Sequence, residues 1–383
     1  MAQTLKTDRI LFVTTMAMVS FGLVILYSAS SINAQVDPRY NSAWYFVVRQ
    51  LGWAVASIVA MMALKKMHYR KMYNPSVAFI AMGVALLLLV AVYFIDAAHH
   101  RWLRFGGFVG VQPSELAKPA LVIFLAYFLT WKARAINNRR YTLAPAAIAV
   151  GFLIMAVVKA DLGTAVVLGA AAAASFFVAG LEIRYCMIAA AVAMLGVLAS
   201  IVAEPYRLAR VVKFVDPELK IVARIDKSGR VKAQIEKSLA THDTNYQLEQ
   251  SKIAVGEGGP IGLGLMNGVQ KLRYLPEAHT DFIYAVVGEE LGLIGAAGLL
   301  IGFGAIFWRG LRATWRMNDD FGRYLALGAT VMIVVQGLMN MSVVLGMMPT
   351  KGIPLPMISY GGSSLLSTLA LLGILMNVSE HAG

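Results

Sequence analysis

The chain has 383 residues, of which 58% are hydrophobic and only 14% are charged, and its formal net charge is +13. Soluble domains carry roughly a quarter of their residues as charged side chains, and disordered chains have few large aliphatic residues, so this composition excludes both classes. The composition is typical of an integral membrane protein. The single cysteine, Cys186, excludes a disulfide framework and a cysteine-based metal site. In a membrane protein the basic residues first report orientation, so we do not expect nucleic acid as a partner.

Apolar runs of about 20 residues are long enough to cross roughly 30 Å of hydrocarbon as helices. We therefore expect an all-α integral membrane protein with a single polytopic domain over residues 1–383. One large extracytoplasmic loop, residues 204–280, separates the seventh and eighth spans, and its polar middle, residues 220–244, predicts a short amphipathic helix or a mobile segment. The ten predicted spans cover residues 10–30, 44–64, 75–95, 112–131, 143–158, 163–181, 184–203, 281–308, 324–346 and 353–378.

Lysine and arginine in the short loops predict the orientation, because cytoplasmic loops carry an excess of both residues. With the N-terminus inside, the cytoplasmic segments hold Lys6, Arg9, Lys65, Lys66, Arg70, Lys71, Lys132, Arg134, Arg139, Arg140, Arg184, Arg309, Arg312, Arg316 and Arg323. The short outer segments hold only Arg39, Arg49, Arg101, Arg104, Lys159 and Lys351. We therefore expect both termini to be cytoplasmic.

Ionisable groups at or inside a span are functional candidates, because each costs about 2.5 kcal/mol or more at the bilayer centre. The first such group contains Arg101 and Trp102, followed by Glu115 and Lys118, which lie three residues apart on one face of a helix that Pro113 begins. Two interpretations stay open: an interfacial tryptophan beside a structural ion pair, or a polar wall at the outer mouth of a cavity. The preceding residues, 99 and 100, are histidines without further ligands at zinc spacing.

Two aspartates stand where helices are predicted to begin. Asp161 follows Lys159 and Ala160 in a short outer connection, and its position favours an N-cap of the next helix. Asp281 is a candidate N-cap too, but a carboxylate between a helix N-terminus and apolar surroundings is also a plausible general base. Glu289 and Glu290 lie deeper in the same apolar run, so that helix must face protein or a wet cavity.

Prolines and glycines interrupt the start of the last span, at residues 349–364. They indicate either a broken or re-entrant segment lined by protein, or a proline-rich turn before the last helix. The glycines at residues 256–268 resemble a phosphate loop but lack its Gly-Lys-Ser/Thr sequence. On the predicted topology all four polar groups lie on the outer side, which favours one extracytoplasmic site over four separate structural features.

Over nearly its whole length the sequence resembles the SEDS family (shape, elongation, division and sporulation), the FtsW/RodA-type peptidoglycan polymerases. Gln270, Lys271 and the LPEAHTD string bring it closer to the FtsW branch. Two features depart from the family pattern: Ala160 replaces a usual proline, and the large loop carries extra polar sequence between residues 217 and 246. The resemblance is carried by Arg101, Trp102, Lys118, Tyr206, Arg207, Arg210, Tyr246, Gln247, Gln250, Ser251, Gly258, Gly259 and residues 112–115 (QPSE), 161–164 (DLGT), 275–283 (LPEAHTDFI), 289–292 (EELG), 354–356 (PLP) and 359–364 (SYGGSS).

The resemblance implies polymerisation of lipid II into β-1,4 glycan strands, with inversion at the donor sugar and release of undecaprenyl diphosphate. It implies that Asp281 deprotonates the acceptor hydroxyl, as the family's essential aspartate does. Glu115 would orient Lys118, and Trp102 would support the lipid or sugar. The further substrate-binding candidates are Asp161, His279 and Ser359, and the cations that would stabilise the diphosphate are Arg101, Lys118, Arg207 and Arg210.

The resemblance also implies partners and a place in the cell. We expect a class B penicillin-binding protein and other division proteins as partners, within the bacterial cytoplasmic membrane at the division septum. No cofactor is certain, and a divalent cation, Mg²⁺ or Mn²⁺, could assist at the diphosphate. Three alternatives stay open: a flippase for lipid-linked precursors, the elongation (RodA-type) polymerase, and a scaffold without enzymatic activity.

Overall fold

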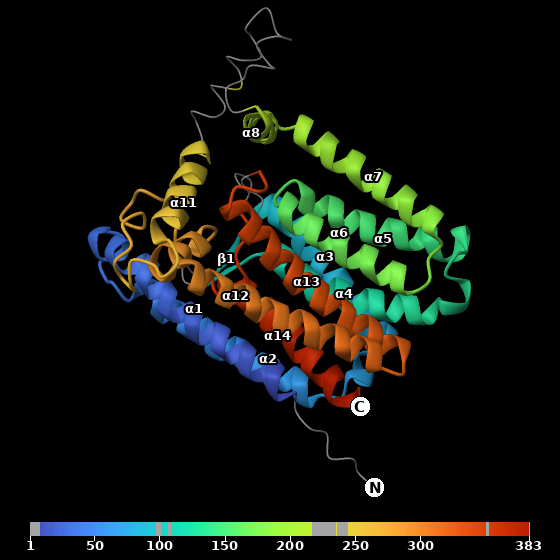
Figure 1. Cartoon of the computed structure of the whole chain (residues 1–383). Helices are drawn as coiled ribbons and strands as arrows, with labels where there is room; N and C mark the ends of the chain where they lie inside the picture. Colours follow the sequence, from blue (N-terminus) through green and yellow to red (C-terminus); the bar gives the residue numbers. More distant parts are fainter. Residues whose placement is uncertain are drawn as a thin grey trace, which may run out of the picture.

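The computed structural model describes residues 8–96, 101–105, 109–216, 235, 244–349 and 352–382, and these residues form a bundle of long helices (Figure 1). Within them, nine helical segments are long and apolar enough to cross a membrane, and α6 is a shorter apolar helix. The prediction of an all-α membrane protein with about ten spans is therefore confirmed. The spans are α1 (Arg9–Val36), α2 (Tyr45–Lys66), α3 (Pro75–Ile95), α4 (Pro113–Trp131), α5 (Ala144–Val158), α6 (Leu162–Val178), α7 (Ile183–Val202), α12 (Ile283–Arg316), α13 (Asp320–Val344) and α14 (Gly362–His381).

Short elements connect these helices. A hairpin of β1 (Leu103–Phe105) and β2 (Val109–Val111) precedes α4, with Leu103 paired to Val111 in an antiparallel register. The sequence pattern did not predict this hairpin, because three-residue strands give almost no periodic signal. The remaining elements are the 3₁₀ turns η1 (Tyr69–Met72) and η2 (Ala133–Ala135), the π turn η3 (Arg139–Leu143), and the helices α8 (Pro205–Val215) and α11 (Thr244–Gly258).

Helices α13 and α14 form the interior of the bundle, and α7 lies at its edge (Figure 1). Helix α14 packs against α2, α4 and α13, and most of its residues are buried. No residue of α7 is buried in the protein, although the helix is strongly apolar. An apolar helix that its own chain does not cover is typical of a helix covered by lipid or by another membrane protein, so the burial pattern agrees with a membrane location.

The two opposite ends of the bundle are built from different elements. At one end, Asp8 at the start of α1 pairs with Arg309 of α12 at 2.7 Å and accepts a hydrogen bond from Ser379 of α14 at 2.8 Å. These contacts bring the first and last spans together, as an even number of crossings requires. The other end contains α8, α11, the hairpin and the start of α12 (Figure 1).

Helix α12 is broken at Gly292, which corrects the prediction of one continuous helix containing both glutamates. Gly292 has φ 62° and ψ −158°, a conformation that is almost restricted to glycine. The break frees the backbone carbonyls of Glu289 and Glu290, which accept hydrogen bonds from the N–H groups of Leu263 at 3.0 Å and Gly264 at 2.9 Å. The loop before α12 therefore supplies the partners that a continuous helix would have supplied.

The carboxylates of Glu289 and Glu290 are fully buried and bound by protein donors, which confirms that this helix faces protein. Glu290 accepts from Lys271 Nζ at 2.5 Å and from Ser28 Oγ at 2.6 Å. Glu289 accepts from the backbone N–H groups of residues 269 and 270, at 2.6 and 2.9 Å. These bonds fasten the loop that precedes α12 to α1 and to α12 itself.

The last span begins later than predicted, at Gly362, and residues 352–361 are irregular. The interpretation as a broken segment lined by protein is confirmed, because most of these residues are buried within the bundle. Within the described part of the large loop, α8 (Pro205–Val215) is amphipathic. Most of residues 220–244, together with the predicted positions 99, 100, 350 and 351, lie outside the described residues.

The break at Gly292 gives a test of the fold. Replacing Gly292 by alanine should destabilise the protein by at least about 1–3 kcal/mol, because the conformation excludes a Cβ and that atom would lie 2.4 Å from the Gly262 nitrogen. Gly298→Ala is the matched control: it lies in the regular part of α12 with open space around its Cβ position. Thermal unfolding in detergent should show a lower midpoint for Gly292→Ala and an unchanged or slightly higher one for Gly298→Ala. Equal midpoints would contradict the break.

Candidate active site

A cavity of about 950 Å³ lies at the end of the bundle that carries α8 and the start of α12. This volume is near the upper limit of ordinary small-molecule sites. Its lining comes from segments far apart in the sequence, among them the residues before β1, the α5–α6 connection, α7, α8, α11, the turn before α12, α13 and residues 352–364. Six of the ten predicted site residues line it: Arg101, Trp102, Asp161, Arg207, Arg210 and Asp281.

Asp281 stands on a tight turn just before α12, and its backbone is fixed from two sides. Asn340 of α13 donates from Nδ2 to the Asp281 carbonyl at 2.7 Å and to the Ile353 carbonyl at 2.7 Å. Ser359 donates from Oγ to the Thr280 carbonyl at 2.5 Å. The N-cap position of α12 is the following residue, so the alternative role of Asp281 as an N-cap is wrong. The carboxylate is left free to face the cavity.

The surroundings of the Asp281 carboxylate bring its titration close to neutral pH. Burial raises the pKa of Asp281 to about 7, and Arg101, the next largest influence, acts in the opposite direction. The carboxylates of Glu277 and Asp161 raise the pKa further, whereas Arg210 lowers it. The backbone of residue 352 lies against the carboxylate, since a Cβ on this glycine would be 2.6 Å from Asp281 Oδ2. A carboxyl group with such a pKa is suited to accept a proton near pH 7.

Asp161 both caps a helix and lines the cavity. Its Oδ1 accepts from the Thr164 N–H at 3.1 Å, and its Oδ2 accepts from Thr164 Oγ1 at 2.6 Å. The expected N-cap of α6 is therefore confirmed. Because both oxygens are engaged, Asp161 acts on the cavity mainly through its negative charge, which raises the pKa of Asp281.

Three arginines and Lys159 give the cavity its positive charge. Arg207 donates to the carbonyls of residues 158 and 159 at the end of α5, at 3.0 and 2.8 Å, which docks α8 onto the bundle. The guanidinium of Arg210 lies 4.0 Å above the Tyr206 ring, one helical turn away. Burial lowers the pKa of Arg210 to about 10, which keeps it protonated at neutral pH. Arg101 donates to the Gly352 carbonyl at 3.4 Å.

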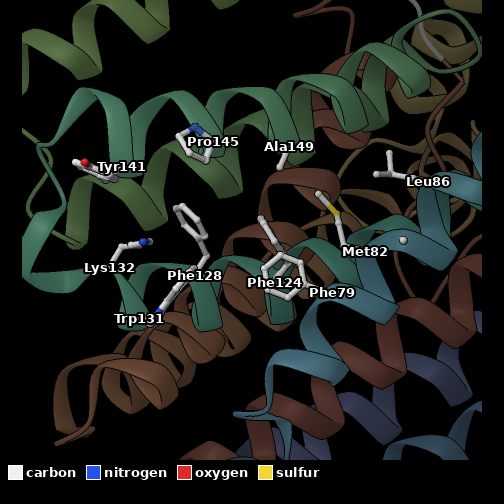
Figure 2. A pocket seen from close by; sticks show the side chains of 11 residues that line it. Phe79, Met82, Leu86, Phe124, Phe128, Trp131, Lys132, Tyr141, Pro145 and Ala149 are labelled. Carbon is white, nitrogen blue, oxygen red and sulfur yellow. The ribbon is translucent and has the colours of Figure 1, made fainter.

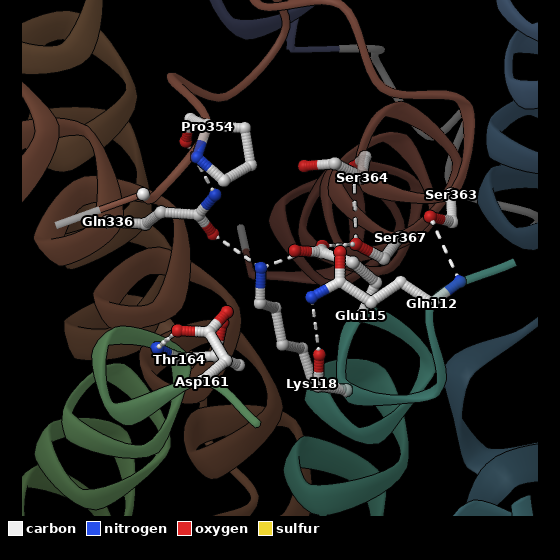
Figure 3. A network of polar contacts seen from close by, with 12 residues as sticks. Gln112, Glu115, Lys118, Asp161, Thr164, Gln336, Pro354, Ser363, Ser364 and Ser367 are labelled. Atoms are coloured by element: carbon white, nitrogen blue, oxygen red, sulfur yellow. Dashed lines mark hydrogen bonds and ion pairs between the residues drawn. The ribbon is translucent and has the colours of Figure 1, made fainter. Parts of the chain in front are cut away.

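Lys118 and Glu115 are buried and do not line the cavity. They belong to a network of polar contacts that also contains Gln336 and Pro354 (Figure 3). Lys118 Nζ binds Glu115 Oε2 at 2.7 Å and Gln336 Oε1 at 2.6 Å. Gln336 in turn donates to the Pro354 carbonyl at 2.8 Å, and Pro354 does line the cavity. The predicted pairing is confirmed, whereas Lys118 does not line the cavity in this structure: its ammonium group holds Glu115 and Gln336, and through Gln336 it supports the irregular segment.

His279 and Ser359 also lie outside the lining. The His279 ring packs against Phe46 with the ring centroids 4.6 Å apart, and burial lowers the pKa of this histidine. The His279 carbonyl accepts from the Tyr360 N–H at 3.0 Å. His279 and Ser359 therefore connect two segments, the turn that contains Asp281 and residues 352–361. Neither side chain lines the cavity in this structure.

Sequence reasoning missed Gln336 and Asn340, which hold the irregular segment from α13. Their signal was present: two amides four residues apart on one face of an apolar span, where polar side chains need partners. It also missed Glu204 as a lining residue; Lys159, from the predicted outer connection, and Gln247, from the family pattern, line the cavity as well. No group of three histidine, cysteine or carboxylate side chains placed to hold a metal ion occurs among the described residues.

Comparisons with known proteins agree on one family. A family model described as a cell cycle protein, covering FtsW, RodA and SpoVE, matches residues 8–383. A protein of Geobacter metallireducens named "Probable peptidoglycan glycosyltransferase FtsW" is 37% identical over 380 residues, which cover 98% of this chain and 95% of that protein. "Stage V sporulation protein E" of Bacillus subtilis is 33% identical over 379 residues, with 98% and 97% covered.

Solved structures share the fold. A chain from work described as "Structural coordination of polymerization and crosslinking by a peptidoglycan synthase complex" superposes with a TM-score of 0.74, at 25% identity and 98% coverage of both chains. The crystal structure of the rod shape determining protein RodA of Thermus thermophilus gives a TM-score of 0.65 at 24% identity, with 98% of this chain and 97% of that chain covered. Together with the family model and the relatives, these matches lead to one conclusion: the chain belongs to the FtsW/RodA/SpoVE family of membrane proteins.

Proposed function

We propose that this protein is a peptidoglycan glycosyltransferase that polymerises lipid II into β-1,4 glycan strands and releases undecaprenyl diphosphate. The observation that carries the proposal is the cavity in which Asp281, with a pKa of about 7, faces Arg101 and Arg210. Family membership and relatives named as peptidoglycan glycosyltransferases support the same activity. The substrate and product carry long prenyl tails, which accounts for an active site at the end of a membrane bundle.

Each chemical demand of the reaction has a candidate residue in the cavity. Asp281 would take the proton from the acceptor sugar's 4-hydroxyl as that oxygen attacks the anomeric carbon of the donor. The bond from that carbon to the diphosphate breaks with inversion, and the leaving diphosphate carries the negative charge away. Arg101, Arg207 and Arg210 are placed to stabilise this charge, and Trp102 offers an apolar surface for the lipid or sugar.

Lys118, His279 and Ser359 enter this proposal as positioning residues. They fix the backbone of residues 352–361 and of the turn before Asp281, which sets where the carboxylate points. A divalent cation remains a prediction. The described residues do not bring three metal ligands together. We therefore propose that the arginines stabilise the negative charge of the leaving diphosphate. Measuring activity while Mg²⁺ or Mn²⁺ is titrated tests whether a metal ion contributes.

We further propose the division role, the orientation and the partner. Most of the relatives at 33–37% identity carry the name FtsW, which supports septal over side-wall synthesis. The excess of basic residues at the end shared by α1 and α14 supports cytoplasmic termini and an extracytoplasmic cavity. The likeness to a chain of a complex that couples polymerization and crosslinking supports a class B penicillin-binding protein as partner. Imaging a tagged copy at the septum or the side wall tests the division role.

Asp281→Asn tests the proposed chemistry. The amide keeps the shape of the side chain but cannot accept the proton, so the rate of glycan formation should fall by at least about 100-fold. The measurement is gel analysis of products from labelled lipid II and purified protein, with and without the penicillin-binding partner. An active Asp281→Asn protein would overturn the role of Asp281. If the parental protein makes no glycan under either condition but moves lipid II across vesicles, it is a flippase.

The pH profile tests the electrostatics of the cavity. Because Asp281 must be deprotonated to act as a base, the rate should rise with pH around a midpoint near 7 and level off above it. Arg101 lowers this pKa, so Arg101→Met should move the midpoint to higher pH in addition to reducing the maximal rate. Arg39→Met, an exposed arginine paired with Asp37, is the control and should leave the midpoint in place. A profile that is flat across neutral pH would contradict the assignment.

Asn340→Ala tests the positioning of Asp281. The change removes the two hydrogen bonds that join the Asp281 carbonyl to the Ile353 carbonyl, and a small displacement of a reacting group can reduce a rate by about 100-fold. We expect a lower maximal rate with little change in KM. Asn377→Ala is the matched control: this buried amide binds three carbonyls at the other end of the bundle, so it should reduce stability but not the rate per folded molecule. Full activity of Asn340→Ala would exclude the role.

A further inference from the structure

An apolar groove of about 410 Å³ lies between α3, α4 and α5 (Figure 2). It shares no lining residue with the larger cavity: Gln112, just before α4, lines the cavity, whereas the groove is lined by the second half of α4, at Phe124 and Phe128. Phe124 and Phe128 of α4 form one wall, and the Phe79 ring of α3 packs edge-on against Phe124 with the ring centroids 5.7 Å apart. Ala149 of α5 lines the other side. Nothing in the proposed reaction uses these residues.

The walls of the groove suit a hydrocarbon chain. All three helices are candidate membrane spans, so the groove opens where lipid tails surround the protein. Apolar and aromatic side chains make up nearly all of its surface, and Lys132 is its one charged lining residue among those described. A chain that fills such a groove gains packing contacts that a disordered tail in the bilayer does not have.

One end of the groove is cationic and aromatic. Trp131, Lys132 and Tyr141 lie together there, and Leu86 lies at the opposite end (Figure 2). Lys132 Nζ stands 3.8 Å from the centre of the Trp131 ring. A tryptophan and a tyrosine at this level are typical of the boundary between hydrocarbon and headgroups, so the ammonium lies where a lipid phosphate would be.

The connection between α4 and α5 adds more positive charge at the same end. Residues 132–143 contain Lys132, Arg134, Arg139 and Arg140 and no acidic residue. Within the described part of the chain, no carboxylate lies within ion-pair distance of these four side chains. Basic pockets between spans on the cytoplasmic side are typical binding sites for anionic lipid headgroups.

We propose that this groove binds one anionic phospholipid. One of its acyl chains lies between α3 and α5 along Phe124 and Phe128, and its phosphate lies beside Lys132 and the basic connection. The positive charge of the connection favours a negatively charged headgroup over a zwitterionic one. The groove holds an acyl chain, which distinguishes a bound lipid from one that only contacts the protein surface. The site is independent of the proposed enzymatic function.

Trp131 provides a built-in probe for this lipid, because bromine atoms on an acyl chain quench a nearby indole. The protein is reconstituted in nanodiscs containing brominated phosphatidylglycerol or brominated phosphatidylcholine at equal mole fraction. Subtracting the signal of Trp131→Phe isolates this tryptophan from the other five. We expect at least twofold stronger quenching of Trp131 by the brominated phosphatidylglycerol.

Two variants separate the headgroup from the groove. Lys132→Gln should remove most of the preference for phosphatidylglycerol. Gly83→Leu places a side chain into the groove, where the Cβ position has no neighbour within 4 Å, and should reduce quenching by both lipids without disturbing the fold. Gly52→Leu is its matched control on α2, equally free of neighbours and outside the groove, and should have no effect.

The outcomes decide between the occupants. Equal quenching by the two brominated lipids would mean ordinary surrounding lipid and would overturn the proposal. A preference that survives Gly83→Leu but is lost in Lys132→Gln would mean that the basic connection attracts headgroups without a bound chain, which also overturns it. Absent quenching by both lipids, with parental protein that is folded and monodisperse, would mean that the groove does not admit a chain.

Discussion

The structure depends on one constraint: backbone polar groups inside a membrane bundle must find partners in the protein, because hydrocarbon offers none. Two stretches of this chain are not helical where they lie among the spans, the turn before α12 and residues 352–361. Their backbone groups bind Asn340, Gln336 and Ser359, or each other. The cavity exists because these stretches are held in place without becoming helix.

A related constraint separates the charges near the cavity into two groups. Lys118 and Glu115 form a supporting group, which holds residue 354 through Gln336. Arg101, Arg210 and Asp281 form a second group, which lines the cavity. In the supporting group, as in the buried Lys271–Glu290 pair, the charges are engaged by protein, since a buried charge without a partner is very costly. In the second group, opposing influences leave the pKa of Asp281 near 7.

The start of α12 shows how a break can stabilise a site. At Gly292 the helix gives up hydrogen bonds that the loop at residues 263–264 replaces. The glutamate side chains beside the break bind the same loop and Lys271, so the chain that leads to Asp281 is fastened along its length. In a regular helix the carbonyls of Glu289 and Glu290 would accept hydrogen bonds within the helix and could not accept them from this loop.

The sequence by itself determined the spans, the family and the set of ionisable residues on the predicted outer side of the membrane. Long apolar runs and basic loops are local signals, and Asp281 and Asp161 stand beside helix starts that the pattern predicts. Only the tertiary structure decided which of these residues share a cavity. Lys118, His279 and Ser359 belong to the same sequence motifs as the lining residues, but they do not line the cavity. Each instead binds a partner from a distant part of the chain, namely Gln336 or the backbone of residues 280 and 360. The amides of α13 could not be assigned from the sequence for the same reason: their role depends on which irregular backbone packs against them, and no local pattern records that contact.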